Sequence, residues 1–250
     1  MAYWIGTSGW SYDHWEGVVY PVGSPDRDRL AWYLKLFRTV EVNSSFYHWP
    51  REETFTHWRE RTPPGFVFVL KASRILTHVK KLEDPEGSIA LMEKGMALLG
   101  EKFGALLVQL PPFLHRDIDL LDTLLGKMPP HRRVVVEFRH ESWHVDDVFA
   151  VLEKHNVGYC ITHGAHLPCI PRVTAPFVYV RFHGPDTENL YAGSYTADDL
   201  AVWADRMKGW ANDGCDVYAY FNNDAYGNAV HNALTLAGML GEPKIGDPLS

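Results

Sequence analysis

The sequence predicts a single TIM-type (β/α)8 barrel, an α/β fold that spans residues 1–250 as one domain. Short runs of β-branched and aromatic residues alternate with longer stretches of helical period, and this alternation occurs eight times. Such an alternation implies parallel strands joined by crossovers. The chain length of 250 residues is also typical of a closed barrel. A doubly wound open sheet is the competing fold, but open sheets rarely reach so many strands in a chain of this length.

The predicted strands are short, apolar and bounded by loop residues. They are Tyr3–Ser8, Val40–Asn43, Phe66–Lys71, Ala105–Leu110, Val134–Arg139, Gly158–Thr162, Phe177–His183 and Asp216–Asn222.

The predicted helices have apolar residues at helical spacing between the strands. They are Arg29–Phe37, Thr54–Arg61, Ser88–Lys102, Ile118–Lys127, Asp147–Lys154, Ala197–Trp210 and Gly227–Leu240. Thr196, with Asp199 three residues later, predicts an N-cap for the sixth of these helices. The segment 163–176 carries three prolines and no helical period, so the helix between the sixth and seventh strands is predicted to be short or missing.

Alternate side chains of each predicted strand face opposite ways, which gives each strand two registers. One register stays apolar and is expected to pack under the helices. The other register opens apolar and turns polar at the C-terminal end of the strands, with Glu41, Asn43, Lys71, Gln109, Glu137, Arg139, Arg181, His183, Asn222 and Asp224. Active sites of TIM barrels lie at this end, so we expect a binding site there. The alternative is a closed network in which these charges pair only to hold the barrel together.

The polar register contains candidates for acid–base chemistry. Glu41 and Glu137 are the predicted proton-transfer residues, and two facing carboxylates would permit glycoside chemistry. Lys71 is the third candidate catalytic residue, since a buried lysine can form a Schiff base. The residues predicted to bind the substrate are Ser8, Trp10, Asn43, Tyr47, Arg74, His78, Gln109, Arg139, His140, Arg181, His183, Asn222, Asn223 and Asp224.

Two alternatives stay open at this stage. Aromatic residues in the predicted loops and the basic segment 74–81 would suit a non-catalytic module that binds a nucleotide or single-stranded RNA. Oxygen and imidazole ligands in the polar register would suit a divalent metal ion in an isomerase or hydrolase, although the neighbouring Lys and Arg side chains compete for the same carboxylates. We predict no resident cofactor and no metal ligands.

Composition and charge narrow the class of protein. With 24 Lys and Arg against 31 Asp and Glu, the net charge of −7 disfavours bulk nucleic-acid binding, while a local basic surface stays compatible with it. No apolar run approaches the roughly 20 residues that span a bilayer, and residues 1–10 enter a strand pattern without a basic leader. We therefore expect a cytoplasmic protein with no membrane partner. The three cysteines are unevenly spaced, which fits neither a disulfide framework nor a zinc ribbon.

Several motifs occur in order along nearly the whole chain. They are Gly6-Thr7-Ser8-Gly9-Trp10-Ser11-Tyr12, Thr39-Val40-Glu41-Val42-Asn43-Ser44-Ser45-Phe46-Tyr47, Lys71-Ala72-Ser73-Arg74, Gln109-Leu110-Pro111-Pro112, Glu137-Phe138-Arg139-His140, Tyr179-Val180-Arg181-Phe182-His183-Gly184 and Tyr220-Phe221-Asn222-Asn223-Asp224. Together they resemble the domain-of-unknown-function-72 (DUF72) family, also called YecE-like. The resemblance implies a TIM-type barrel and places the family's signature residues in the polar register, but it implies no reaction. From the residues themselves we expect an enzyme of the hydrolase, isomerase or lyase type, acting on a small polar, anionic or carbohydrate-like substrate.

Overall fold

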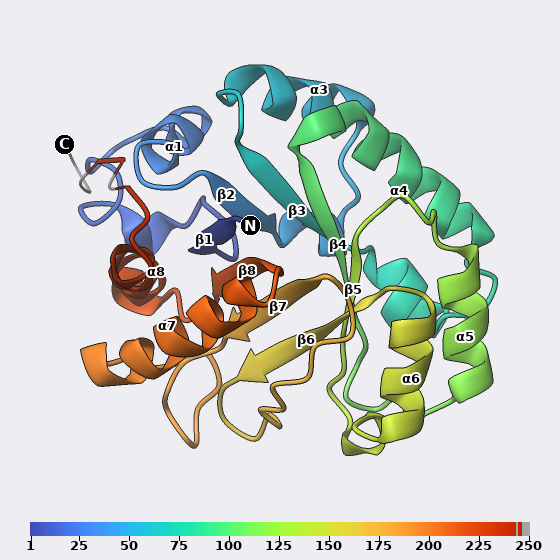
Figure 1. Cartoon of the computed structure of the whole chain (residues 1–250). Coiled ribbons are helices and arrows are strands. Elements are labelled where there is room, and N and C mark those ends of the chain that lie inside the picture. Colours follow the sequence, from blue (N-terminus) through green and yellow to red (C-terminus); the bar gives the residue numbers. More distant parts are fainter. Residues whose placement is uncertain (244, 247–250) are drawn as a thin grey trace. The chain divides into compact units, whose positions relative to one another are not determined.

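The computed structural model describes residues 1–243, 245 and 246, and it has the predicted TIM-type α/β fold (Figure 1). Within these residues, parallel strands form one eight-stranded sheet in the order β1-β8-β7-β6-β5-β4-β3-β2. The strands are β1 (Tyr3–Thr7), β2 (Thr39–Val42), β3 (Val67–Lys71), β4 (Phe103–Gln109), β5 (Val134–Glu137), β6 (Gly158–His163), β7 (Phe177–Phe182) and β8 (Asp216–Phe221). A bridge between Ser8 and Glu41 links the two ends of this order.

Helices connect the strands, and most lie close to the predicted ranges. They are α1 (Asp26–Tyr33), α2 (Ser44–Tyr47), α3 (Glu52–Arg61), α4 (Glu86–Leu99), α5 (Ile118–Lys127), α6 (Asp146–Lys154), α7 (Ala197–Asn212) and α8 (Asn228–Met239). Short 3-10 helices are η1 (Asp13–Trp15), η3 (Gly100–Lys102), η4 (Glu141–Trp143) and η5 (Ala225–Gly227), and η2 (Ile75–Val79) is a π-helix. As the prolines predicted, no helix is present between β6 and β7 in the described part of the chain.

Three helix ends show how local chemistry sets the boundaries. Helix α1 begins three residues earlier than predicted, because two acidic residues of its first turn favour a helix N-terminus. Helix α4 ends at Leu99, three residues earlier than predicted, because Gly100 takes a positive φ of 57° that stops the helix. The predicted N-cap of α7 is confirmed, since the Thr196 hydroxyl accepts from the backbone N–H of Asp199 at 3.2 Å.

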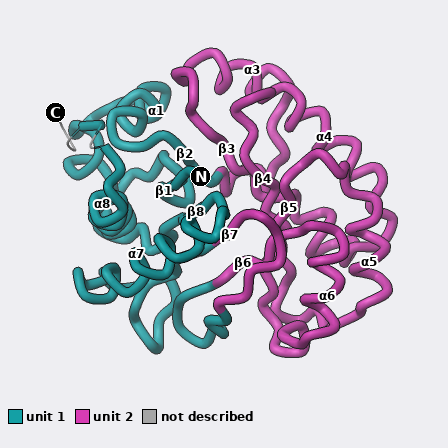
Figure 2. The backbone as a smooth tube through the Cα atoms, viewed as in Figure 1, with its two compact units in different colours: residues 1–41, 162–170, 180–250 teal, residues 42–161, 171–179 magenta. Residues whose placement is uncertain are grey.

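The described chain forms two compact units, coloured separately in Figure 2. Unit 1 comprises residues 1–41, 162–170 and 180–246 without residue 244, and unit 2 comprises residues 42–161 and 171–179. The prediction of a single domain stays a prediction, and we describe each unit by itself.

In both units the apolar register of the strands packs under helices, as predicted. In unit 2, Trp58 of α3 stacks on Phe68 of β3 with ring centroids 5.7 Å apart. In unit 1, Trp203 of α7 packs edge-on against Phe182 of β7 at 5.0 Å, and Phe182 stacks on Phe221 of β8 at 4.4 Å. Burying such a ring contributes about 1.5–3 kcal/mol, so these contacts orient the opposite register away from the helices.

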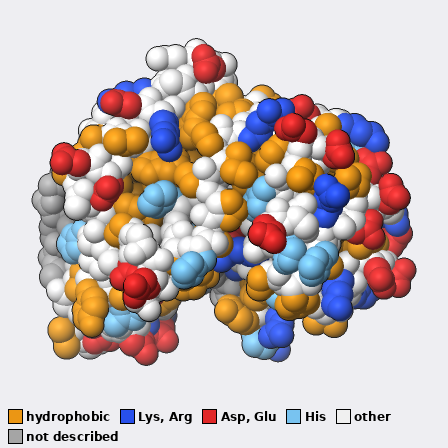
Figure 3. Space-filling model, turned by 90° about the horizontal axis from the view of Figure 1, so that it is seen from below, with side chains coloured by type: hydrophobic (Ala, Val, Ile, Leu, Met, Phe, Trp, Pro, Cys, Tyr) orange, Lys and Arg blue, Asp and Glu red, His pale blue; other side chains and the backbone are white. Residues whose placement is uncertain are grey.

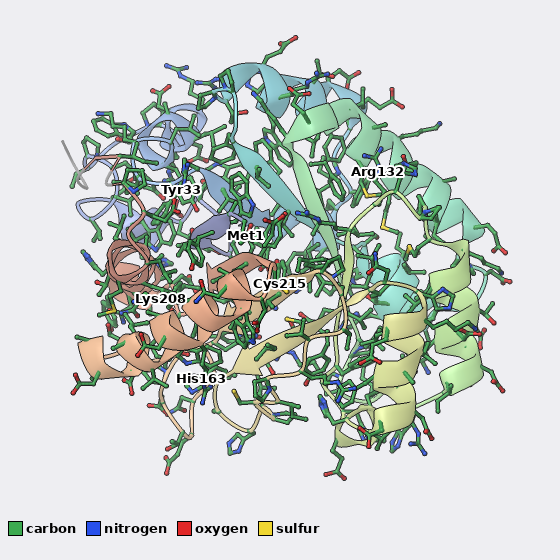
Figure 4. The ribbon with its side chains drawn as sticks, viewed as in Figure 1. Met1, Tyr33, Arg132, His163, Lys208 and Cys215 are labelled. Carbon is green, nitrogen blue, oxygen red and sulfur yellow. The ribbon has the colours of Figure 1, made fainter. Side chains whose placement is uncertain are left out.

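Unit 1 also holds a buried tyrosine that ties its strands together (Figure 4). Tyr33, at the end of α1, donates its hydroxyl hydrogen to the carbonyl of Thr39 at 2.9 Å and accepts from the backbone N–H of Thr7 at 3.1 Å. Burial raises the pKa of Tyr33, so its hydroxyl stays a neutral donor at ordinary pH. These contacts join the carboxyl end of β1, just before Ser8, to the first residue of β2, two residues before Glu41.

Among the helices of residues 1–243, 245 and 246, none has the length and apolar composition to cross a bilayer.

Candidate functional site

Unit 2 carries a row of polar side chains at the carboxyl ends of three neighbouring strands. Lys71 ends β3, Gln109 ends β4 and Glu137 ends β5. Gln109 pairs in register with Glu137, and Lys71 pairs with Leu107 two residues before Gln109, so the three polar side chains lie on the same face. Lys71 and Gln109 are partly exposed, whereas Glu137 is fully buried. The predicted polar register is therefore present at this edge of unit 2.

A buried ion pair lies at the end of β5. Arg139 donates from Nε to Oε1 of Glu137, and 8% of the Arg139 side chain remains exposed. The other carboxylate oxygen of Glu137 lies 3.8 Å from Sγ of Cys160 on β6. Glu137 thus fixes the direction of a guanidinium whose side chain still reaches the surface.

Lys71 is held by its neighbours in the chain segment after β2. Its Nζ lies 4.4 Å from the centroid of the Phe46 ring, a cation–π contact. Its backbone N–H donates to the Ser45 hydroxyl at 3.2 Å, and that hydroxyl lies 2.7 Å from the Lys71 carbonyl. Short helix α2, which carries both Ser45 and Phe46, therefore positions this lysine.

Histidines lie beside this row in unit 2. His78 packs edge-on against Phe46 at 4.9 Å, and its pKa is lowered, chiefly by burial and further by the positive charges of Lys71 and Arg74. His78 is therefore a neutral imidazole near pH 7. His140 follows β5, and its Nδ1 lies 2.9 Å from the Ser142 hydroxyl.

One amide oxygen in unit 2 lacks a hydrogen-bond partner. Asn43 follows β2, and among the described residues no donor reaches its buried Oδ1. A buried acceptor left unpaired costs about 1–3 kcal/mol, so such atoms call for an explanation. A hydroxyl or amide hydrogen of a bound molecule would satisfy this oxygen.

Unit 1 carries a second polar cluster, which is fully buried. The Ser8 hydroxyl donates to Oε1 of Glu41 at 2.5 Å, and Arg181 donates to the same oxygen from Nη2 at 2.7 Å and from Nε at 3.1 Å. None of the three residues is more than 1% exposed. The buried Glu41 carboxylate therefore fixes the orientation of the Arg181 guanidinium within unit 1.

His183 directly follows β7 and has polar contacts of its own. His183 is fully buried, its Nδ1 lies 3.3 Å from Nδ2 of Asn222, and the ring of Tyr191 covers it edge-on at 5.3 Å. The backbone N–H of His183 donates to the carbonyl of His163 on β6. Hydrogen bonds thus join His163, His183 and Asn222 in unit 1.

Two further predicted residues of unit 1, Asp224 and Asn223, have structural contacts. The Asp224 carbonyl accepts from Nε1 of the buried Trp15 at 3.0 Å, and its carboxylate lies 3.3 Å from Nε2 of His14. Asn223 is fully buried and donates from Nδ2 to the carbonyl of Gly193 and to Oδ1 of Asn232, both at 2.9 Å. This asparagine holds the loop between β7 and α7.

The predicted site residues divide between the two units. Unit 1 contains Ser8, Trp10, Glu41, Arg181, His183, Asn222, Asn223 and Asp224, and unit 2 contains Asn43, Tyr47, Lys71, Arg74, His78, Gln109, Glu137, Arg139 and His140. Hydrogen bonds join Ser8, Glu41 and Arg181, join His183 to Asn222, and join Glu137 to Arg139. Convergence of both sets on one pocket stays a prediction.

Sequence reasoning missed the residues that position these side chains. Ser45, Phe46 and Cys160 contact Lys71 or Glu137, yet a serine, a phenylalanine and a buried thiol carry no signal of that role in the sequence. Only the position of Ser45 and Phe46 within the Thr39–Tyr47 motif could have indicated it. Among the described residues, no group of three or more His, Cys, Asp and Glu side chains is arranged to hold a metal ion.

Comparison with known proteins gives a family model and two curated relatives. The family model described as "Protein of unknown function DUF72" matches residues 4–248. The UPF0759 protein YunF of Bacillus subtilis is 25% identical over 285 residues, which cover 95% of this chain and 94% of that protein. The UPF0759 protein YecE of Escherichia coli is 29% identical over 141 residues, which cover 56% of this chain and 49% of that protein.

Solved structures of similar proteins share the fold. A DUF72 family protein of Thermotoga maritima superimposes with a TM-score of 0.87 at 29% identity, over 97% of this chain and all (100%) of that chain. A DUF72 family protein of Enterococcus faecalis gives a TM-score of 0.83 at 19% identity, over 96% of each chain, which shows the fold alone.

Proposed function

The chain belongs to the DUF72 family of proteins of unknown function, and from this premise we propose that it is an enzyme acting on a small anionic or carbohydrate-like substrate. The reaction would take place at the carboxyl ends of the strands. The ion pair of Glu137 and Arg139 carries this proposal, because a fully buried carboxylate there holds the guanidinium of a side chain that stays 8% exposed. Active sites of TIM barrels are built at this end of the strands.

The cost of burying this ion pair favours a functional role for it over a purely structural one. Taking a carboxylate and a guanidinium out of water costs several kcal/mol for each ion, and apolar side chains of similar volume are often as stable or more stable. Polar groups on the neighbouring strands, Lys71 and Gln109, repeat the same pattern at partly exposed positions. A site that binds a charged or hydroxylated molecule accounts for polar groups at each of these places.

Each side chain suits a distinct role in the proposed reaction. Arg139 can bind a phosphate or carboxylate through parallel N–H bonds, and Lys71 adds a positive charge on the neighbouring side of the row. The unpaired Oδ1 of Asn43 would accept a hydrogen bond from a substrate hydroxyl. Glu137, ion-paired with Arg139, would act as a general base that removes a proton from the bound substrate.

A screen with matched variants tests this proposal. The panel contains glucose 6-phosphate, ribose 5-phosphate, p-nitrophenyl phosphate and p-nitrophenyl glycosides, and the readouts are the rise in unfolding temperature and product release. Replacing Arg139→Met should abolish the rise in unfolding temperature, and Glu137→Gln should keep binding while lowering turnover by at least about 100-fold. The exposed pair of Arg172 and Glu153, whose Nη2 and Oε1 lie 2.8 Å apart, supplies the controls Arg172→Met and Glu153→Gln.

The outcomes separate the proposed site from a structural ion pair. The control variants should respond to the panel like the wild-type protein. A ligand response that survives Arg139→Met would remove Arg139 from the site. A panel in which no compound stabilises or reacts would contradict the proposed substrate class.

A further inference from the structure

Unit 2 exposes large apolar side chains around the π-helix η2. Tyr47 of α2 is 62% exposed, Phe113 in the loop after β4 is 57% exposed, and Val79 of η2 is 64% exposed. Leu76 and Thr77 anchor η2 because both are fully buried. Clustered exposed apolar residues of this kind mark interaction surfaces more often than isolated ones do.

Ring contacts connect the two exposed aromatic residues. The Tyr47 ring packs edge-on against Phe46 at 5.0 Å, Phe46 packs against His78 at 4.9 Å, and His78 packs against Phe113 at 6.3 Å. We call Tyr47, His78 and Phe113 with the flanking cations Arg74, Lys80 and Lys81 the aromatic-basic surface. The buried Phe46 gives it a fixed support, so its rings are held in place before any ligand binds.

The charge of this surface differs from that of the whole chain. The chain carries −7, and acidic and basic side chains are interspersed over the face in Figure 3. The segment 71–82 contains four Lys and Arg residues and no acidic residue, and Glu83 and Asp84 come only after it. Arg74, Lys80 and Lys81 are exposed, and Nζ of Lys81 lies 5.8 Å from the Phe113 ring centroid.

We propose that the aromatic-basic surface of unit 2 binds single-stranded nucleic acid. Exposed rings can stack with unpaired bases. The cations beside the rings attract the negatively charged phosphates of the strand. A duplex hides the faces of its bases and would use only the cations. An acidic peptide would likewise use the cations but has no flat ring for Tyr47 and Phe113. This proposal does not depend on the enzymatic function proposed above, which rests on the ion pair of Glu137 and Arg139.

Fluorescence anisotropy with labelled oligouridylate and oligothymidylate tests this proposal on the full-length protein. Tyr47→Ala and Phe113→Ala should each weaken binding about tenfold, which corresponds to about 1.4 kcal/mol of lost stacking. Tyr226, which is 86% exposed and lies in unit 1, supplies the matched ring control Tyr226→Ala, and its affinity should equal that of the wild-type protein. Circular dichroism should show folded protein for all three variants, since each of these side chains is exposed.

Salt titration tests the cations of the same surface. With three phosphates neutralised, the logarithm of the binding constant should fall against the logarithm of salt concentration with a slope of about −2, and Lys81→Gln should reduce that slope by about 0.7. Lys94, an exposed residue of α4, supplies the control Lys94→Gln with an unchanged slope.

Four results would overturn the proposal. The first is absence of binding at low salt, and the second is equal affinity of the ring variants and the wild-type protein. The third is competition by duplex or polyglutamate that is as strong as competition by the unlabelled single strand. The fourth is a dimer in sedimentation that Tyr47→Ala dissociates. The last result would assign the surface to contact between two copies of the chain.

Discussion

Removing Glu41 should destabilise the protein far more than removing Glu41 and Arg181 together. Glu41 is fully buried, Arg181 is 1% exposed, and two guanidinium nitrogens donate to one carboxylate oxygen. Glu41→Leu removes the buried carboxylate oxygen to which Nε and Nη2 of Arg181 donate, so we expect a loss of about 3–5 kcal/mol in the free energy of unfolding. Against the roughly 5–15 kcal/mol that stabilise a typical domain, this loss is large.

The double variant Glu41→Leu/Arg181→Met should recover this loss. With both charges gone, no ion has to be desolvated, so its stability should equal that of the wild-type protein or exceed it by about 1–4 kcal/mol. Urea unfolding followed by circular dichroism at pH 7 measures all three proteins. The exposed pair of Arg172 and Glu153 serves as a control, for which removing either charge should cost no more than about 1 kcal/mol.

A small effect would contradict this account of the pair. A loss below about 1 kcal/mol for Glu41→Leu would show that water or another acceptor compensates the Arg181 charge. A double variant as unstable as the single variant would show that the apolar side chains do not fill the space, and that the ion pair is needed for packing.

Three further predictions concern the loops and buried groups of the two units. Gly184→Ala should destabilise unit 1 more than Gly214→Ala in urea unfolding. Gly184 has a φ of +100° and Gly214 has a φ of +94°, but only at Gly184 would the new Cβ lie 2.1 Å from the Ala192 carbonyl oxygen. Equal losses in the free energy of unfolding would contradict this prediction. Lys102→Met should lower the free energy of unfolding by about 1–3 kcal/mol in the same assay, because Nζ of Lys102 donates hydrogen bonds to two backbone carbonyls at the end of α3. No measurable loss would show that water replaces these hydrogen bonds. Burial lowers the pKa of His163 in the folded protein. The free energy of unfolding should therefore be highest above pH 6.5 and should decrease as the pH falls from 6.5 toward this lowered pKa. An NMR titration of His163 with a midpoint at or above 6.5 would refute this prediction.

The fold was predictable because its signals are local and repeated. Alternating apolar runs and helical stretches gave the strands, and three prolines between residues 163 and 176 correctly indicated the missing helix. The short helices α2 and η2 were not predicted, because segments of four or five residues are too short to show a helical period. These two helices carry Phe46 and His78, so the surroundings of Lys71 could not be derived from the sequence.

The polar register was predictable from strand parity, but its partners were not. Parity placed Lys71, Gln109 and Glu137 on one face, and the observed register agrees. Nothing local in the sequence indicates that Asn223 holds a loop through Asn232, or that Glu41 pairs with Arg181, which is 140 positions away in the chain. Such contacts depend on which strands become neighbours, and only the folded chain supplies that information.

The most direct measurement of the proposed site is a crystal structure of the protein with the panel phosphate that stabilises it most. We predict that the phosphate lies within about 3.5 Å of the Arg139 guanidinium or of Nζ of Lys71, with Glu137 still paired to Arg139. A phosphate bound only at other residues, with Arg139 covered by its neighbours, would contradict the assignment of this edge of unit 2 as the substrate site.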